Sequence, residues 1–300
     1  MPGLYGSSGK DLVEFKGWLA KGDYRISSIS ASGTSVDLHV PNRSPLVESF
    51  SYDFARFVCA ACESTRGIEA DREFPKATAW AAIRFYYSAF FAAHAILRYF
   101  GVSCSQIDFE QSAKVNEFAS SIYQIQNRMQ SGFYAARFNS ISSDMIMSKY
   151  GDSHKDTWKV FKDVITSVRH SVISGSGLAS DKLKVSQVMD DLCQAISAEG
   201  ASSGNWLSQY RNAINYRQAF DVWYPYKKTS IDFGAVAKYT AGWKGGINPS
   251  LALNESDRRM RFFGVCAVIM CLMKSLASDL SKNSARASIH STRTARLIGM

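Results

Sequence analysis

A stretch of 25 residues, from Lys76 to Phe100, is apolar on nearly every side when it is drawn as a helix. Its large apolar side chains are Trp80, Ile83, Phe85, Tyr86, Tyr87, Phe90, Phe91, Ile96, Leu97, Tyr99 and Phe100. A helix that is apolar all round has to be covered by other elements. The stretch therefore predicts a central, buried helix, and Gly101 in the C′ position predicts its end.

Four polar side chains interrupt this stretch: Arg84, Ser88, His94 and Arg98. At 100° per residue they share one arc of about 120° on the helix. A charge on a buried helix has to be paired or to face a cleft. Two interpretations stay open, since the arginines either pair with acidic residues of neighbouring helices or face a cleft that binds an anion.

Hydrophobic periodicity predicts a mainly α-helical chain. Further helices are expected at about residues 52–64, 108–129, 156–172, 180–198, 205–220 and 255–282. The alternating patterns near residues 24–28 and 36–40 predict a small β-hairpin. Residues 130–155 predict a broken or short helix, and the irregular stretch 224–253 is typical of a functional or mobile segment.

The formal net charge of +9 lies entirely in the last third of the chain. Residues 1–204 hold 21 basic and 21 acidic residues, whereas residues 205–300 hold 14 basic and 5 acidic residues. A basic C-terminal third favours an anionic partner, nucleic acid first and acidic protein second, although a solvated basic tail gives the same count.

Several sequence features bear on location and cofactors. The six cysteines are too few for a disulfide scaffold, and Cys59 and Cys62 lack the further ligands of a zinc site. The longest apolar run, Phe262 to Met273, is shorter than the roughly 20 residues that a bilayer requires. No secretory signal is apparent, so we expect a cytoplasmic protein without a membrane partner, metal or cofactor.

Two segments carry a resemblance to a known domain family. The run from Tyr86 to Leu97, YYSAFFAAHAIL, followed by Gly101, is similar to the core helix of HEPN (higher eukaryotes and prokaryotes nucleotide-binding) domains. The run 209–217, QYRNAINYR, resembles the segment in which HEPN ribonucleases carry an Arg, a polar residue and a later His. Arg211 and Asn212 match, but Tyr216 or Arg217 stands where the His belongs.

The resemblance implies a HEPN-like helical domain over residues 51–282, with an inserted helical segment at about 102–200. A β-hairpin extension over 1–50 and a disordered basic tail over 283–300 complete the predicted organisation. HEPN domains often dimerise, so a homodimer or a partner protein is expected. Many are metal-independent endoribonucleases of toxin, CRISPR-associated or antiviral defence systems, and others are inactive binding modules.

The family reaction is attack of the ribose 2′-hydroxyl on the adjacent phosphate, which needs a cation and a proton carrier. Arg211 is the predicted cation, and Asn212 and Tyr216 complete the candidate catalytic segment. His94 is the one histidine that we propose as a substitute for the missing His. Without such a substitute, the alternative is a catalytically inactive HEPN-like module that binds RNA or a partner protein in an assembly.

Basic and aromatic residues interleave again near the start of the last long helix. The predicted RNA-binding residues are Arg84, Arg98, Lys244, Arg258, Arg259 and Arg261. Cations beside aromatic rings are typical of single-stranded RNA binding, and they are equally typical of a solvated helix start. On the helical wheel, Arg217 falls on the apolar stripe that contains Trp206 and is predicted to point toward the core. Arg211, Asn212 and Tyr216 fall on the opposite half and are predicted to face away from it.

Overall fold

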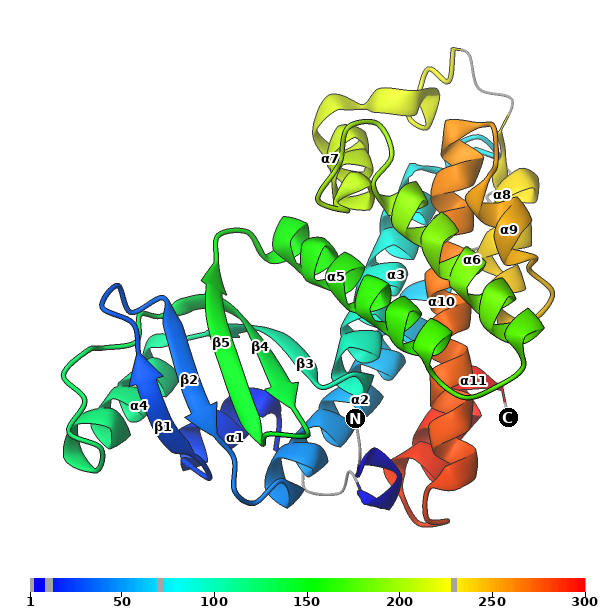
Figure 1. The fold of residues 1–300 in the computed structure, drawn as a ribbon. Coiled ribbons are helices and arrows are strands. Elements are labelled where there is room, and N and C mark those ends of the chain that lie inside the picture. The colour runs from blue at the N-terminus through cyan, green and yellow to red at the C-terminus, as the bar shows by residue number, and fades with distance from the viewer. Residues whose placement is uncertain (1–2, 9–12, 69–72, 228–230, 300) are drawn as a thin grey trace. The chain divides into compact units, whose positions relative to one another are not determined.

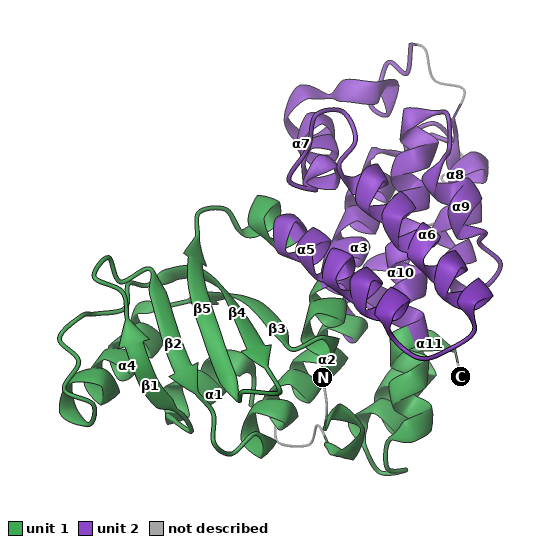
Figure 2. Ribbon diagram, viewed as in Figure 1, with its two compact units in different colours: residues 1–58, 94–157, 276–300 green, residues 59–93, 158–275 purple. Residues whose placement is uncertain are grey.

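The computed structural model describes residues 3–8, 13–68, 73–227 and 231–299 (Figure 1). The chain divides into two compact units (Figure 2). Unit 1 comprises residues 1–58, 94–157 and 276–300, and unit 2 comprises residues 59–93 and 158–275. Residues of both units belong to α2 (Ser44–Thr65), α3 (Ala79–Tyr99), α5 (Ser153–Ser174) and α10 (Arg258–Asn283).

Unit 1 contains one five-stranded antiparallel sheet with the strand order β1-β2-β5-β4-β3. The strands are β1 (Arg25–Ile29), β2 (Ser35–His39), β3 (Val102–Ile107), β4 (Gly132–Asn139) and β5 (Asp144–Tyr150). Met147 of β5 is paired with Val36 of β2 on one side and with Ala136 of β4 on the other. Met145 and Met147 are buried while Ile146 between them is exposed, so one face of β5 lies in the core.

The sheet corrects the prediction for the middle of the chain. The predicted hairpin is present as β1 and β2, but it is only part of a larger sheet. Residues 102–150, predicted to belong to a helical insertion, supply the other three strands. The strand signal of β4 is weak because the four successive residues 133–136 are buried, which removes the alternation that identifies a half-buried strand.

The helices of unit 1 pack around aromatic side chains. Phe15 of α1 (Phe15–Lys21) stacks on Trp18 at 5.7 Å and contacts Phe50 of α2 at 5.8 Å. Helix α4 (Phe109–Ser121) is shorter than the predicted 108–129. Asn116 donates to the Met129 carbonyl and accepts from its amide, so the chain after α4 runs back along the helix.

The C-terminal tail differs from the predicted disorder over residues 283–300. Its described part forms a π-helical turn, η4 (His290–Thr294), and a last helical turn, α11 (Ala295–Ile298). His290 is fully buried, with its Nε2 atom 2.6 Å from the Ser51 hydroxyl of α2, and Ile298 is buried as well. These inward-facing residues give the tail a packed side that its Ser- and Arg-rich composition does not reveal.

The regular secondary structure among the described residues of unit 2 is helical. Besides α3, α5 and α10, they form α6 (Ala179–Ile196), α7 (Trp206–Arg217), α8 (Phe233–Thr240) and α9 (Pro249–Leu253), with short turns η2 (Ala219–Asp221) and η3 (Gly242–Lys244). The helices predicted at 156–172, 180–198, 205–220 and 255–282 are confirmed as α5, α6, α7 and α10. The irregular stretch 224–253 holds α8, η3 and α9.

Helix α3 confirms the prediction of a buried helix with aromatic side chains. Phe85, Tyr86 and Ala89 are fully buried, whereas Trp80 in its first turn is 63% exposed. Gly101 has a φ of 78°, the left-handed conformation expected of a glycine just beyond a helix. The predicted position and end of this helix are therefore correct.

Helix α10 lies directly against α9. A Cβ atom at Gly264 of α10 would lie 2.2 Å from the Ala252 carbonyl oxygen, so only glycine fits there. Among the described residues, α10 is the one helix long and apolar enough to cross a membrane, and most of that apolar stretch is buried.

Candidate nucleic-acid interface

Arg211 lies on α7 and covers two tyrosines of α3. Its guanidinium carbon is 5.2 Å from the centroid of the Tyr86 ring and 5.8 Å from that of the Tyr87 ring. Arg211 is only 7% exposed, and no carboxylate among the described residues pairs with it. The two segments that resemble HEPN domains therefore pack together, and the aromatic rings cover the guanidinium.

The hydroxyl of Tyr86, whose ring lies against Arg211, is buried and hydrogen-bonded. The indole of Trp158 donates a hydrogen bond to it at 3.2 Å. Burial raises the pKa of Tyr86 to about 12, despite the opposing effect of Trp158 and Arg211. Tyr86 therefore remains a neutral phenol at physiological pH and offers no base for RNA cleavage.

The predicted orientation of α7 is wrong for Arg211 and Arg217. The buried stripe of this helix consists of Trp206, Leu207, Tyr210, Arg211 and Ile214. Arg211 is at the edge of the stripe, where the tyrosines of α3 cover it. Asn212 and Tyr216 are exposed, as predicted, and Arg217 is exposed because it lies in the last helical turn.

His94 belongs to unit 1, whereas Arg211 belongs to unit 2. Its imidazole is buried and stacks on the Phe57 ring with centroids 4.8 Å apart. Burial, with a smaller contribution from Arg98, lowers the pKa of His94 to about 3. Neither unit on its own therefore brings the predicted substitute histidine together with Arg211.

The two arginines of α3 make internal contacts. Arg98 is 1% exposed and pairs with Asp53 of α2 at 3.1 Å, while it donates to the Val102 carbonyl. Arg84 is half-buried and donates to the carbonyls of Arg66 and Gly67. Pairing with an acidic residue of a neighbouring helix is thus the interpretation that fits Arg98, and we leave Arg98 out of the interface.

The arginines at the start of α10 each form an internal ion pair. Arg258 and Arg261 both pair with Glu199, and Arg259 pairs with Asp257 at 3.0 Å. Arg258 additionally lies over the Phe220 ring, 4.5 Å from its centroid. These ion pairs make the three arginines weaker RNA contacts than their sequence spacing indicates.

Lys244 is the remaining predicted RNA-binding residue. Its ammonium group is exposed and lies 6.0 Å from the centroid of the buried Trp243 ring. No acidic side chain pairs with it in the part of the chain that the structure describes. Lys244 therefore remains a candidate contact for an anion.

An exposed group of aromatic and basic residues escapes the sequence analysis. We call it the aromatic–basic patch, and it consists of Trp80, Tyr216, Arg217, Trp223, Tyr224, Tyr226 and Lys227. Tyr216 and Tyr224 are 76% and 80% exposed, whereas Trp223 and Tyr226 are half-buried. Several large exposed rings close together on a protein surface indicate an interaction site. The sequence feature that could have predicted this patch is the run of five aromatic residues within positions 216–226, which is followed by a lysine.

Specific contacts hold part of this patch in place. The rings of Trp80 and Trp223 meet edge to face with centroids 5.8 Å apart, and the Trp223 indole donates to the Ile214 carbonyl of α7 at 3.0 Å. Tyr224 and Tyr226 form a second edge-to-face pair at 5.9 Å. The start of α3 and the end of α7 therefore anchor the segment that carries the exposed rings.

The charge of the patch is basic. Arg217 and Lys227 are exposed, and neither forms an ion pair with a described residue. The one carboxylate within the segment 216–227, that of Asp221, contributes to raising the pKa of Arg259 and so acts toward α10. Rings that can stack on bases thus occur beside cations that can contact phosphates.

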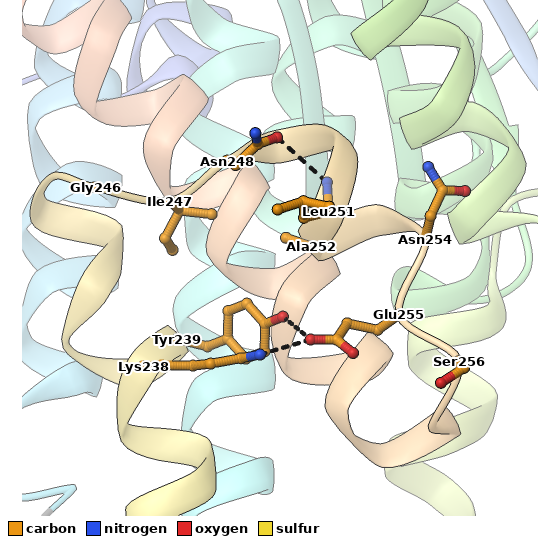
Figure 3. A pocket seen from close by; sticks show the side chains of 10 residues that line it. All are labelled: Lys238, Tyr239, Gly246, Ile247, Asn248, Leu251, Ala252, Asn254, Glu255 and Ser256. Atoms are coloured by element: carbon orange, nitrogen blue, oxygen red, sulfur yellow. Dashed lines mark hydrogen bonds and ion pairs between the residues drawn. The ribbon is translucent and has the colours of Figure 1, made fainter.

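Unit 2 also contains a pocket of about 520 Å³, lined by α8, α9 and the residues that follow each of them. Figure 3 shows Lys238 and Tyr239 directed at the same oxygen of Glu255. The Lys238 partner is the main cause of the lowered pKa of Glu255, so the carboxylate is ionised at neutral pH. The pocket therefore offers a fixed negative oxygen beside a lysine.

No metal centre is found among the described residues, which contain no group of three or more histidine, cysteine or acidic side chains placed to hold an ion. Burial raises the pKa of the Cys62 thiol to about 11. The Cys62 thiol therefore stays protonated at neutral pH, and Cys59 is half-buried.

Comparisons with protein-family models, with curated proteins and with solved structures each find no match for this chain. The resemblance to HEPN domains consequently depends on the two sequence segments alone.

Proposed function

We propose that this protein binds single-stranded RNA through the aromatic–basic patch, as a HEPN-like module without a nuclease centre of its own. The observation that carries the proposal is the exposure of Trp80, Tyr216 and Tyr224, in a patch whose basic side chains form no ion pair with a described residue. Aromatic rings stack on unpaired bases of any identity, and cations contact the strand's phosphates.

Binding is favoured over cleavage because the predicted catalytic groups are covered. Arg211 is buried against Tyr86 and Tyr87, and His94 is a buried, neutral imidazole of the other unit. A general base has to reach the proton that it removes. The endoribonuclease alternative has no comparable support in either unit.

Removing the exposed rings should weaken RNA binding. We expect Trp80→Ala and Tyr224→Ala each to raise the Kd for a single-stranded RNA oligonucleotide about 10-fold, because stacking on an aromatic ring contributes about 1–3 kcal/mol per base. Fluorescence anisotropy at fixed salt measures the change. Phe109→Ala is the matched control, since Phe109 is an exposed ring of unit 1 and its loss should leave the Kd unchanged. Equal effects of all three substitutions would refute the assignment.

The cations of the patch should be visible in the salt dependence of binding. Each phosphate contact to a single strand contributes about 0.7 to the slope of log K against log salt concentration. We expect Arg217→Ala and Lys227→Ala each to reduce the slope by about that amount. Arg259→Ala, which removes a cation paired with Asp257, should change it less. A slope near zero in the unmodified protein would exclude a polyanion as the partner.

Arg211→Met separates the binding proposal from the nuclease alternative. Because the guanidinium is buried without a carboxylate, an apolar side chain of similar size should change the free energy of unfolding by less than about 1 kcal/mol. RNA affinity should also be unchanged. The measurement combines urea unfolding, RNA binding and incubation of labelled RNA with EDTA. Cleavage that survives EDTA and disappears in this variant would establish the nuclease instead.

A further inference from the structure

The pocket beside α8 and α9 is built around one carboxylate whose two oxygens differ. The Lys238 ammonium and the Tyr239 hydroxyl both donate to Oε1 of Glu255, at 2.6 and 2.5 Å. Oε2 accepts no hydrogen bond from any described residue, and the side chain is 23% exposed. Figure 3 shows the two donors on one side of the carboxylate. Oε2 is therefore a fixed hydrogen-bond acceptor that a ligand can reach.

Two asparagines that line the pocket are also held in one orientation. The Asn248 side-chain oxygen accepts from the Leu251 amide, which leaves its NH₂ group as an available donor. The Asn254 NH₂ group donates to the Ser250 carbonyl at 2.9 Å, which leaves its oxygen as an available acceptor. The pocket thus presents two acceptors, from Glu255 and Asn254, and one amide donor.

The charges of the pocket balance each other. Lys238 and Glu255 carry opposite charges, so their ion pair adds no net charge to the pocket. An anionic ligand that reached Oε2 of Glu255 would meet a negative oxygen, whereas a ligand with an N–H group can donate to it. The exposed Leu251 side chain and the adjacent Ile247 supply apolar surface. A neutral ligand that has both an apolar face and an N–H donor meets these conditions.

We infer that this pocket binds a neutral heterocycle that carries an exocyclic amino group, such as adenine or cytosine, with the amino group donating to Oε2 of Glu255. A volume of about 520 Å³ lies within the range of small-molecule sites. Uracil presents a carbonyl oxygen where cytosine has its amino group. That oxygen would face the Glu255 carboxylate, so uracil should be rejected.

Glu255→Gln gives a direct test, because it should reverse this preference. The glutamine carbonyl takes the place of Oε1 as acceptor for Lys238 and Tyr239, and its NH₂ group takes the place of Oε2. An acceptor thereby becomes a donor, which suits uracil and not cytosine. In calorimetric titrations with the full chain, we expect cytidine and adenosine to bind about 10-fold more tightly than uridine. The variant should bind uridine at least as tightly as cytidine.

Controls separate this inference from the proposed function. Glu117→Gln alters an exposed glutamate of unit 1 and should leave the cytidine preference unchanged. Trp80→Ala should weaken RNA binding and leave nucleoside binding intact, because Trp80 does not line the pocket. Titrations with oligo-A and oligo-U RNA test whether the pocket binds a base within a strand, whereas the nucleoside titrations test whether it binds a free nucleoside. Absence of nucleoside binding together with equal affinity for both oligonucleotides would overturn the inference, as would a variant that keeps the cytidine preference.

Discussion

Asp53→Asn should lower the free energy of unfolding by about 3–5 kcal/mol, because it removes the counter-charge of a buried guanidinium. Arg98 is 1% exposed, and its Nε atom lies 3.1 Å from the Asp53 carboxylate. Asparagine has nearly the same shape as aspartate, so the substitution removes the charge without opening a cavity. Urea unfolding at neutral pH measures the loss.

An exposed ion pair of the same unit serves as the control. Asp144 pairs with His39 at 2.9 Å, and both side chains are largely open to water. We expect Asp144→Asn to cost less than about 1 kcal/mol. The double variant Asp53→Leu with Arg98→Met should recover much of the lost stability, because a buried ion pair can be replaced by apolar residues of similar volume. A loss for Asp53→Asn as small as that of the control would show that the hydrogen bonds of Arg98 to the Val102 carbonyl and the Ser105 hydroxyl suffice.

The sequence predicts the elements whose signal is local. Helix α3 has its apolar residues on all sides and a glycine at its end, and both features act within a few residues. The β1–β2 hairpin likewise has an alternating pattern on each side of a tight turn. These parts of the fold can therefore be predicted without knowing which distant residues they contact.

The remaining strands depend on partners far away in the chain. Strand β5 pairs with β2, whose residues lie more than one hundred positions earlier. Strand β4 is covered on both faces, so its composition resembles that of a buried helix. Long-range pairing decides between helix and strand for such a segment, and a local pattern does not contain that information.

The electrostatics of the candidate site also depend on residues that are distant in the chain. The basic residues at the start of α10 are recognisable from their spacing, but Glu199, which pairs with two of them, lies about 60 residues earlier. The aromatic residues in 216–226 have the composition of a packed segment, and only the structure shows that Tyr216 and Tyr224 are exposed. Among the described basic residues that unit 2 contributes to the last third, Arg217, Lys227 and Lys244 are exposed without an ion pair, so they are its candidate contacts for an anionic ligand. Unit 1 contributes four more exposed basic residues without a described ion pair, Lys282, Arg286, Arg293 and Arg296.

Acidification below pH 6.5 should destabilise the protein through its buried histidines. The loss of stability should begin well above the pKa of about 4 of ordinary carboxyl groups. His290 is fully buried beside Ser51 and the edge of the Phe54 ring. Burial lowers the pKa of His290 from 6.5 to about 4. Between these values the unfolded chain binds a proton that the folded chain excludes. Stability is therefore complete above pH 6.5 and decreases as the pH falls toward 4.

The size of the effect follows from the difference between the two pKa values. One pKa unit corresponds to 1.36 kcal/mol, so His290 should account for a loss of about 3 kcal/mol between pH 6.5 and pH 4. His94, with its pKa lowered to about 3, should add a similar loss over the same interval. His290→Gln keeps a partner for Ser51 but cannot titrate. In urea unfolding at pH 7 and pH 4.5, the variant should lose about 2–3 kcal/mol less stability than the unmodified protein. An identical loss in both proteins would mean that the His290 imidazole is accessible to water and protonates in the folded state.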